Sequence, residues 1–237
     1  MKLFKSTVAS IAVLSAATMV AADEISEEMR DVDAFTKVKL EGSMDVEVKV
    51  GGEQSVKVIA DSDIIEYLRT RVHGGELEID IKHESGTRKL FRRVKKMQVI
   101  ITVPSLEGAE VHGSGDMIVE DAQAEKFVLE VHGSGDAVLE NAKVETLEVE
   151  LQGSGDIEVD GSCEDVRVEL QGSGDVKATK MHCKAADVML QGSGDVDVYA
   201  TYSADVTVRG SGDIRVEGKP EKINSRVRGS GDIHVSD

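Results

Sequence analysis

One carboxylate recurs seven times in the sequence, always directly after the tripeptide Gly-Ser-Gly. The GSGD tetrapeptide begins at residues 113, 133, 153, 172, 192, 210 and 229, in steps of 20, 20, 19, 20, 18 and 19 residues. If equivalent residues stack, these carboxylates form a column in which neighbours repel. We expect each to accept hydrogen bonds from the N–H groups of its own turn; a less favoured alternative is that the column binds Ca²⁺ through oxygen ligands. The carboxylates are those of Asp116, Asp136, Asp156, Asp175, Asp195, Asp213 and Asp232.

The residue before each tetrapeptide is polar and would form a second column. His112 and His132 hold two equivalent positions and could share a transition metal with a corner aspartate, but a solvated polar pair is the favoured interpretation. Three glutamines follow and are predicted to pair amide to amide along the stack, as in cross-β ladders. The sequence therefore assigns no metal ligand and no cofactor. The glutamines are Gln152, Gln171 and Gln191.

The two cysteines occupy equivalent places in neighbouring repeats. Cys163 lies nine residues before Gly172, and Cys183 lies nine residues before Gly192. In a stacked coil their separation would match the coil spacing, inside the Cα window that a disulfide requires. We predict a disulfide between them, worth about 3 kcal/mol; the alternative is two buried free thiols.

One segment is basic in an otherwise acidic chain. Its cations crowd around Leu90 and Phe91. The favoured interpretation is a solvated hairpin loop, and the alternative is a contact with an anionic glycan, a lipid headgroup or a partner protein. The cations are Arg88, Lys89, Arg92, Arg93, Lys95 and Lys96.

The repeat itself predicts the fold. Apolar residues alternate before each corner, as in Leu147, Val149 and Leu151, and again after it, as in Ile157 and Val159, which is the pattern of strands with one buried face. A fixed period near 20 residues favours a parallel β-helix over a meander of hairpins. Glycine suits the sharp corners because it has no Cβ. The corner glycines are Gly113, Gly115, Gly133, Gly135, Gly153, Gly155, Gly172, Gly174, Gly192, Gly194, Gly210, Gly212, Gly229 and Gly231.

The first 22 residues read as an export signal. Lys2 and Lys5 precede an apolar run from Val8 to Val20, and small residues follow before Asp23. Removing this segment leaves 28 − 2 = 26 basic and 45 acidic residues, a net charge of 26 − 45 = −19. Such a surface argues against nucleic acid as a partner. No other apolar run reaches the ~18 residues of a membrane helix, so we expect an exported chain, periplasmic or at the cell surface, without a transmembrane segment.

The order of the pieces resembles the head GIN domain family of autotransporter adhesins. The resemblance rests on FTKVKLEGSMDVEVKVGG, IIEYLRTRVHGGELEIDI, MQVIITVPSLEGAEVHGSGD and the GSG repeats. It implies an all-β fold, a right-handed parallel β-helix of two packed sheets with GSGD corners every ~20 residues, and a role in cell adhesion. We divide the chain into a signal peptide (1–22), an N-terminal β part (23–112) and the repeat β-helix (113–237). Coiling is expected to begin early, because residues 42–45 form a degenerate copy of the corner.

The sequence favours a noncatalytic protein. Charged positions repeat evenly, and no GxSxG, HExxH or phosphate-loop motif is present. We expect an adhesin-like surface module with a protein or glycan partner; the alternative is a periplasmic or envelope structural or scaffolding protein. A cation-binding repeat protein and a polysaccharide-acting enzyme are less favoured. The chain ends just after a corner, so exposed strand edges predict homo-oligomers.

Overall fold

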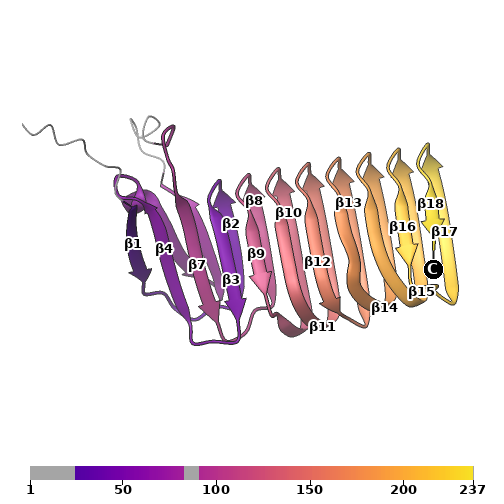
Figure 1. Ribbon diagram of the computed structural model, residues 1–237, viewed down its shortest axis with the longest axis horizontal. Helices are drawn as coiled ribbons and strands as arrows, with labels where there is room; N and C mark the ends of the chain where they lie inside the picture. Colours follow the sequence, from indigo (N-terminus) through magenta and orange to yellow (C-terminus); the bar gives the residue numbers. More distant parts are fainter. Residues whose placement is uncertain (1–24, 83–90, 237) are drawn as a thin grey trace, which may run out of the picture.

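A computed structural model of the protein describes residues 25–82 and 91–236. Almost every described element is a β-strand, and the strands stand side by side along one long axis (Figure 1). Residues 1–22, interpreted as an export signal, lie outside the described residues, as do Arg88 and Lys89. Within the described part, no helix is long and apolar enough to cross a membrane.

The repeats form a parallel solenoid, as the period predicts. Gly113 pairs with Gly133 and Gly133 with Gly153, so the register advances one repeat per coil. A hairpin meander would instead pair neighbouring strands antiparallel. The repeat strands are β8 (Gly108–Gly113), β9 (Met117–Glu120), β10 (Gln123–Gly133), β11 (Ala137–Gly153), β12 (Ile157–Ser162), β13 (Asp165–Gly172), β14 (Val176–Gly192), β15 (Val196–Gly210), β16 (Ile214–Glu217), β17 (Lys222–Gly229) and β18 (Ile233–Val235).

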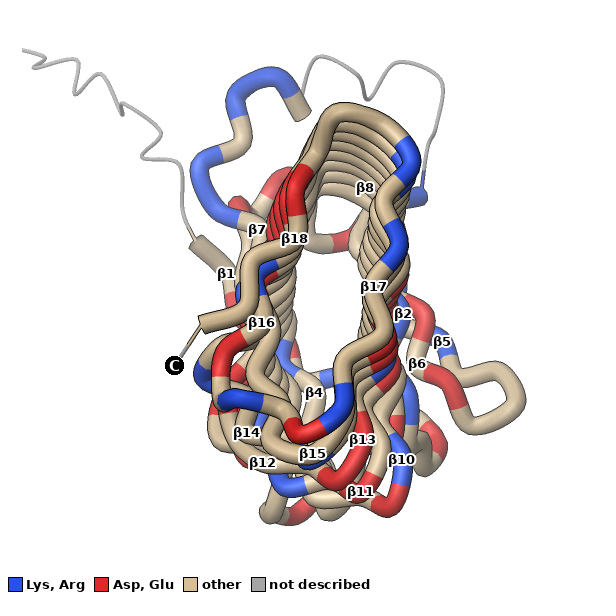
Figure 2. Tube along the Cα trace, turned by 90° about the vertical axis from the view of Figure 1, so that its right-hand side faces the viewer, with Lys and Arg blue, Asp and Glu red and all other residues tan. Residues whose placement is uncertain are grey.

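The coils build two sheets that face one another, which we name by the GSGD corner. The entry face holds the strand segments that lead into the corner, in the order β8, β10, β11, β13, β14, β15, β17. The exit face holds those that follow it, in the order β9, β11, β12, β14, β15, β16, β18. The long strands β11, β14 and β15 contribute to both faces. An end-on view shows the two walls (Figure 2). The right-handed winding stays a prediction.

The core fills the space between the walls with aliphatic side chains. Equivalent residues stack from coil to coil, such as Leu129, Val149, Val168 and Val188, and all are buried. Burying one such side chain stabilises the fold by about 1.5–3 kcal/mol. Because each coil buries its apolar residues against the next, stability depends on neighbouring coils.

Coiling does begin before the regular repeats. β2 (Lys37–Gly42) and β3 (Asp45–Val50) flank the degenerate corner and pair in parallel with β8 and β9. On their other side lie β6 (Glu76–Ile81) and β7 (Met97–Val103). The described strands are thus hydrogen-bonded continuously across residue 112, and the division of the chain there stays a prediction.

Antiparallel strands finish the N-terminal end. β4 (Ser55–Asp61) pairs with β7, β1 (Ile25–Arg30) pairs with β4, and β5 (Leu68–His73) pairs with β6. A short 3₁₀ helix, η1 (Ile65–Tyr67), joins β4 to β5. The alternation of apolar residues does not distinguish these strands from the parallel ones, since both patterns have period two.

Candidate functional site

The GSG corners are close-packed columns of backbone. Gly153 has a φ of +142°, and a Cβ there would collide with the carbonyl oxygen of Gly133 in the previous coil. Gly155 would collide in the same way with the carbonyl oxygen of Gly135. Between them, the N–H of Ser154 donates to the carbonyl of Gly133 at 2.9 Å. Glycine is therefore needed at these corners because the next backbone occupies the place of a side chain.

The corner aspartates form a ladder between coils, so the expectation that each bonds its own turn is wrong. Oδ1 of Asp116 accepts the backbone N–H of Asp136 at 2.9 Å, and Oδ1 of Asp136 accepts that of Asp156 at 2.8 Å. A backbone N–H is a good donor to an ionised carboxylate, and the stacked register places it one coil away. The ladder continues through Asp175, Asp195, Asp213 and Asp232.

A second acidic cluster has carboxylates spaced as in a metal site, but arginine side chains pair with them. Among the described residues, Glu41, Glu78 and Asp80 bring three carboxylates together. Arg69 donates to both oxygens of Asp80 at 2.6 and 2.8 Å. Burial alone would raise the pKa of Asp80, but the hydrogen bonds and charges of Arg69 and Arg71 outweigh it and lower that pKa. The cluster is therefore a structural ion-pair network.

The histidine pair lies ring against ring on the entry face. The ring centroids of His112 and His132 are 4.7 Å apart and the planes are tilted by 58°. Partial burial, together with the positive charge of Lys39 and the neighbouring His132, lowers the pKa of His112. This arrangement favours the neutral form of His112.

The glutamines of the same column do not form an amide ladder, so that expectation is wrong. Gln152 donates to Glu150 at 2.5 Å, and Gln171 donates to Glu169 at 2.9 Å, each two residues back on its own strand. A carboxylate is the stronger acceptor, because it carries a full charge.

The disulfide between Cys163 and Cys183 is present. It links neighbouring coils with a Cα separation of 4.5 Å and a sequence separation of 20. Both residues are buried. Such a bond is typical of proteins in oxidising compartments.

Part of the basic segment is held against the N-terminal end. Arg92, Arg93 and Lys95 are exposed, whereas Phe91 packs against the core and its ring lies 6.1 Å from that of Tyr67. A side-chain oxygen of Asp61 accepts the backbone N–H of Lys95 at 2.8 Å, and the N–H of Asp61 donates to the carbonyl of Lys96. These contacts hold residues 91–96 at the N-terminal end while Arg92, Arg93 and Lys95 stay exposed.

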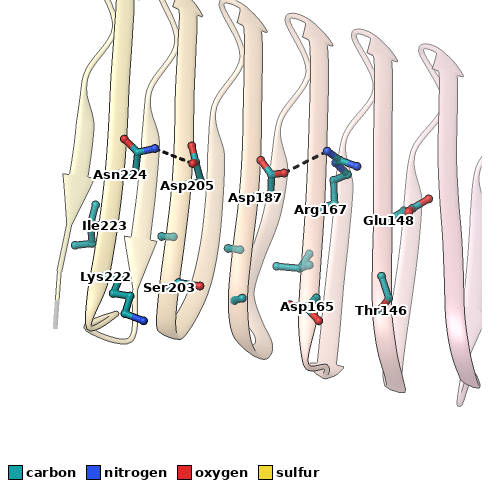
Figure 3. Close-up of a pocket in the computed structure, with 14 residues that line it drawn as sticks. Thr146, Glu148, Asp165, Arg167, Asp187, Ser203, Asp205, Lys222, Ile223 and Asn224 are labelled. Carbon is teal, nitrogen blue, oxygen red and sulfur yellow. Dashed lines mark hydrogen bonds and ion pairs between the residues drawn. The ribbon is translucent and has the colours of Figure 1, made fainter.

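A groove of about 560 Å³ runs across the entry face, and sequence reasoning missed it. It crosses five strand segments, from β11 to β17 (Figure 3). Its floor contains small residues, Ala185 and Ser203, seven positions before their corners. One side of the groove is formed by larger polar side chains that lie two positions after these small residues, such as Asp187 and Asp205. The sign of the groove in the sequence is these two small outward residues, since the same position in the neighbouring coils carries Thr146, Asp165 and Lys222.

The polar side of the groove is partly paired within itself. Arg167 donates to Asp187 at 3.3 Å, and Asn224 donates to Asp205 at 2.8 Å (Figure 3). The carboxylate of Glu148 forms an ion pair with the ammonium group of Lys126, at 2.8 Å. These residues place both hydrogen-bond acceptors and donors on successive coils, which suits a ligand with many hydroxyl groups.

The fold and its corners define a class, the disulfide-linked parallel β-solenoid with stacked GSG turns. The chain belongs to the family described as "putative auto-transporter adhesin, head GIN domain", whose family model matches residues 34–220. The resemblance seen in the sequence is thereby confirmed. No curated protein matches the chain.

Solved structures from Bacteroides and Parabacteroides species share the fold. A Bacteroides fragilis structure described as a putative adhesin is 24% identical, with a TM-score of 0.85 over 91% of this chain and 98% of that chain. A Parabacteroides distasonis structure described as a putative lipid binding protein is 24% identical, with a TM-score of 0.73 over 90% and 97%. A putative adhesin from Parabacteroides merdae is 18% identical, with a TM-score of 0.68 over the same shares. At these identities the likeness shows the fold alone.

Proposed function

We propose that the protein is a noncatalytic, adhesin-like module of the cell envelope that binds a surface glycan along the entry-face groove. The groove carries this proposal, because it offers polar groups at regular steps across five strand segments. Family membership supports the adhesin-like role. The disulfide supports export to an oxidising compartment.

The geometry of the groove suits an extended polymer. Coils repeat about every 4.8 Å, so successive sugar rings can lie over successive coils. Asp165, Asp187 and Asp205 accept hydrogen bonds from hydroxyls, and Arg167 and Asn224 donate them. The small floor residues leave room for the rings.

The same residues argue against catalysis at the groove. A glycoside-cleaving site needs two carboxylates in distinct environments, one of them kept protonated. Asp187 is paired with Arg167, and Asp205 is paired with both Asn224 and Arg226. Both carboxylates are exposed and engaged, which suits binding better than proton transfer.

The proposal that the groove binds a glycan is tested by a variant whose larger side chain fills the groove. Ser203→Arg places a long side chain on the floor without touching the core, and we expect it to reduce glycan binding at least tenfold on a glycan array. Thr207→Arg is the matched control, because it lies on the same strand and face but outside the groove. Equal binding by both variants and the unchanged protein would refute the groove as the binding surface.

Location separates adhesion from the second candidate, a periplasmic scaffolding role. That role is favoured by the exposed Arg92 and Arg93, which could contact anionic envelope polymers. Intact cells would be treated with protease and the protein blotted, with a periplasmic control. Cleavage supports adhesion, whereas protection until the outer membrane is permeabilised supports the scaffold.

A further inference from the structure

The outer side of the entry face carries matched polar pairs next to the first four GSGD corners. In each of these coils, the residue directly before the corner lies close to a glutamate two positions back on the same strand, at distances between 2.5 and 3.7 Å. Each of these polar side chains therefore has a carboxylate beside it. The pairs are His112 with Glu110, His132 with Glu130, Gln152 with Glu150, and Gln171 with Glu169.

Two later coils carry arginine in this column and lack the glutamate. Arg209 and Arg228 stand directly before their corners, but two positions back the residue is Thr207 in one coil and Arg226 in the other. Arg209 is aligned with Arg228 across β15 and β17, and Thr207 is aligned with Arg226. Figure 2 shows basic residues along β17. Guanidinium groups thus gather where the earlier coils place carboxylates.

No described residue replaces the missing glutamate. Arg209 and Arg228 are exposed, and neither guanidinium has a hydrogen bond or an ion pair with another described residue. The carboxylate of the nearby corner is directed along the stack, since Oδ1 of Asp213 accepts the backbone N–H of Asp232 at 2.7 Å. Two arginines in register therefore offer their hydrogen-bond donors to the solvent.

Arg226 adds a third guanidinium whose own pairing is weak. Its side chain is 60% exposed, and its Nη1 lies 3.7 Å from Oδ1 of Asp205. The other oxygen of Asp205 accepts a hydrogen bond from Asn224 at 2.8 Å. Neighbouring coils lie only ~4.8 Å apart, so the positive charges of the three arginines repel one another. An anion bound between them would offset this repulsion.

We propose that Arg209, Arg226 and Arg228 bind a phosphate or sulfate group. A guanidinium donates two parallel hydrogen bonds to such an oxyanion, and a tetrahedral oxyanion has enough oxygens for more than one guanidinium. The group belongs to a slender ligand and not to an anionic membrane, because the glutamates of the same wall repel a flat anionic surface. The three side chains lie on the outer side of the wall, which the stacking of coils does not cover. The inference does not depend on what the groove binds.

Arg209→Gln tests the site, and it should fold normally because earlier coils carry glutamine in this column. Binding of dextran sulfate would be measured by titration calorimetry at physiological salt, with unsulfated dextran as the blank. We expect the variant to bind about tenfold more weakly, and the double change Arg209→Gln and Arg228→Gln to abolish binding. Arg215→Gln is the matched control, because it removes the same charge from an exposed arginine just after the same corner, but on the exit face. Melting temperatures would check that each variant folds.

Two further probes separate the possible sources of the anion. Sodium phosphate should compete with dextran sulfate, and phosphatidylglycerol vesicles should bind no better than phosphatidylcholine vesicles. Vesicle binding that Arg209→Gln abolishes would overturn the proposal in favour of a membrane contact. The proposal would also be overturned if dextran sulfate did not bind, or if Arg209→Gln and Arg215→Gln weakened its binding equally, since the effect would then be one of net charge.

Discussion

The backbone amide of Asp175 donates a 2.9 Å hydrogen bond to Oδ1 of Asp156, its equivalent one coil earlier. The carboxylate is used here as an acceptor, so its charge is not essential. Asp156→Asn keeps an oxygen acceptor and removes repulsion from the neighbouring aspartates, and we expect unchanged or higher stability. Asp156→Ala removes the acceptor and should cost about 1 kcal/mol. Urea unfolding of both variants checks this; an asparagine variant as unstable as the alanine variant would show that the charge itself matters.

A second prediction concerns the corner glycines. Gly155→Ala forces a Cβ into the carbonyl of Gly135, so we expect a loss on the order of 3 kcal/mol or local unfolding of the coil. Gly75→Ala is the control: its φ is +83°, but no atom lies within 4 Å of a Cβ built there. That variant should lose only the ~1–2 kcal/mol of a left-handed backbone. Thermal melting compares them, and similar losses would contradict the collision argument.

The disulfide gives a third prediction. Reduction, or the double change Cys163→Ala and Cys183→Ala, should lower the free energy of unfolding by about 3 kcal/mol. The reason is that the bond restricts the unfolded chain over a 20-residue separation. Unfolding with and without reductant measures this loss. The double variant is its own control, since reductant should leave it unaffected.

The histidine pair predicts a dependence on pH. The pKa of His112 is lowered in the folded protein by partial burial, Lys39 and His132, although Glu110 and Glu41 oppose this. The folded state therefore favours neutral His112, and the stability it contributes is full above the unfolded pKa of about 6.5. It is lost as the pH falls from there through the folded pKa, because the unfolded chain binds the proton more readily.

Glutamine is the natural replacement, since later repeats carry it at this position. His112→Gln should show a smaller loss of melting temperature between pH 7 and pH 5 than the unchanged protein. His182→Gln is a control on the outer exit face, away from the pair. If His112→Gln changes nothing in this range, the pair is not the source of the pH dependence.

Much of the fold could be predicted from the sequence because its repeat is regular. One period near 20 residues, alternating apolar residues and GSG at fixed places are sufficient for a stacked parallel coil. The spacing of Cys163 and Cys183 also placed the disulfide correctly. These features depend on which residues align between neighbouring coils, and the spacing of the repeats gives that alignment directly.

The wrong predictions concern the directions in which side chains point, because the spacing of residues in the sequence does not determine them. The sequence shows that corner aspartates stack, but not that each carboxylate turns toward the next coil. It shows that Gln152 is outward, but not that Glu150 competes for its amide. The groove was missed because it arises from small side chains, Ala185 and Ser203, whose effect is an empty volume.

The disulfide between Cys163 and Cys183 would also resist mechanical unfolding if the solenoid were pulled from the side of its last described coils. Coils held only by hydrogen bonds and apolar packing can peel away one after another, each at low force. The covalent link between two neighbouring coils would halt this unzipping before it reached the earlier repeats. Under tension, the disulfide would therefore confine unfolding to the coils that follow it and keep the earlier coils folded.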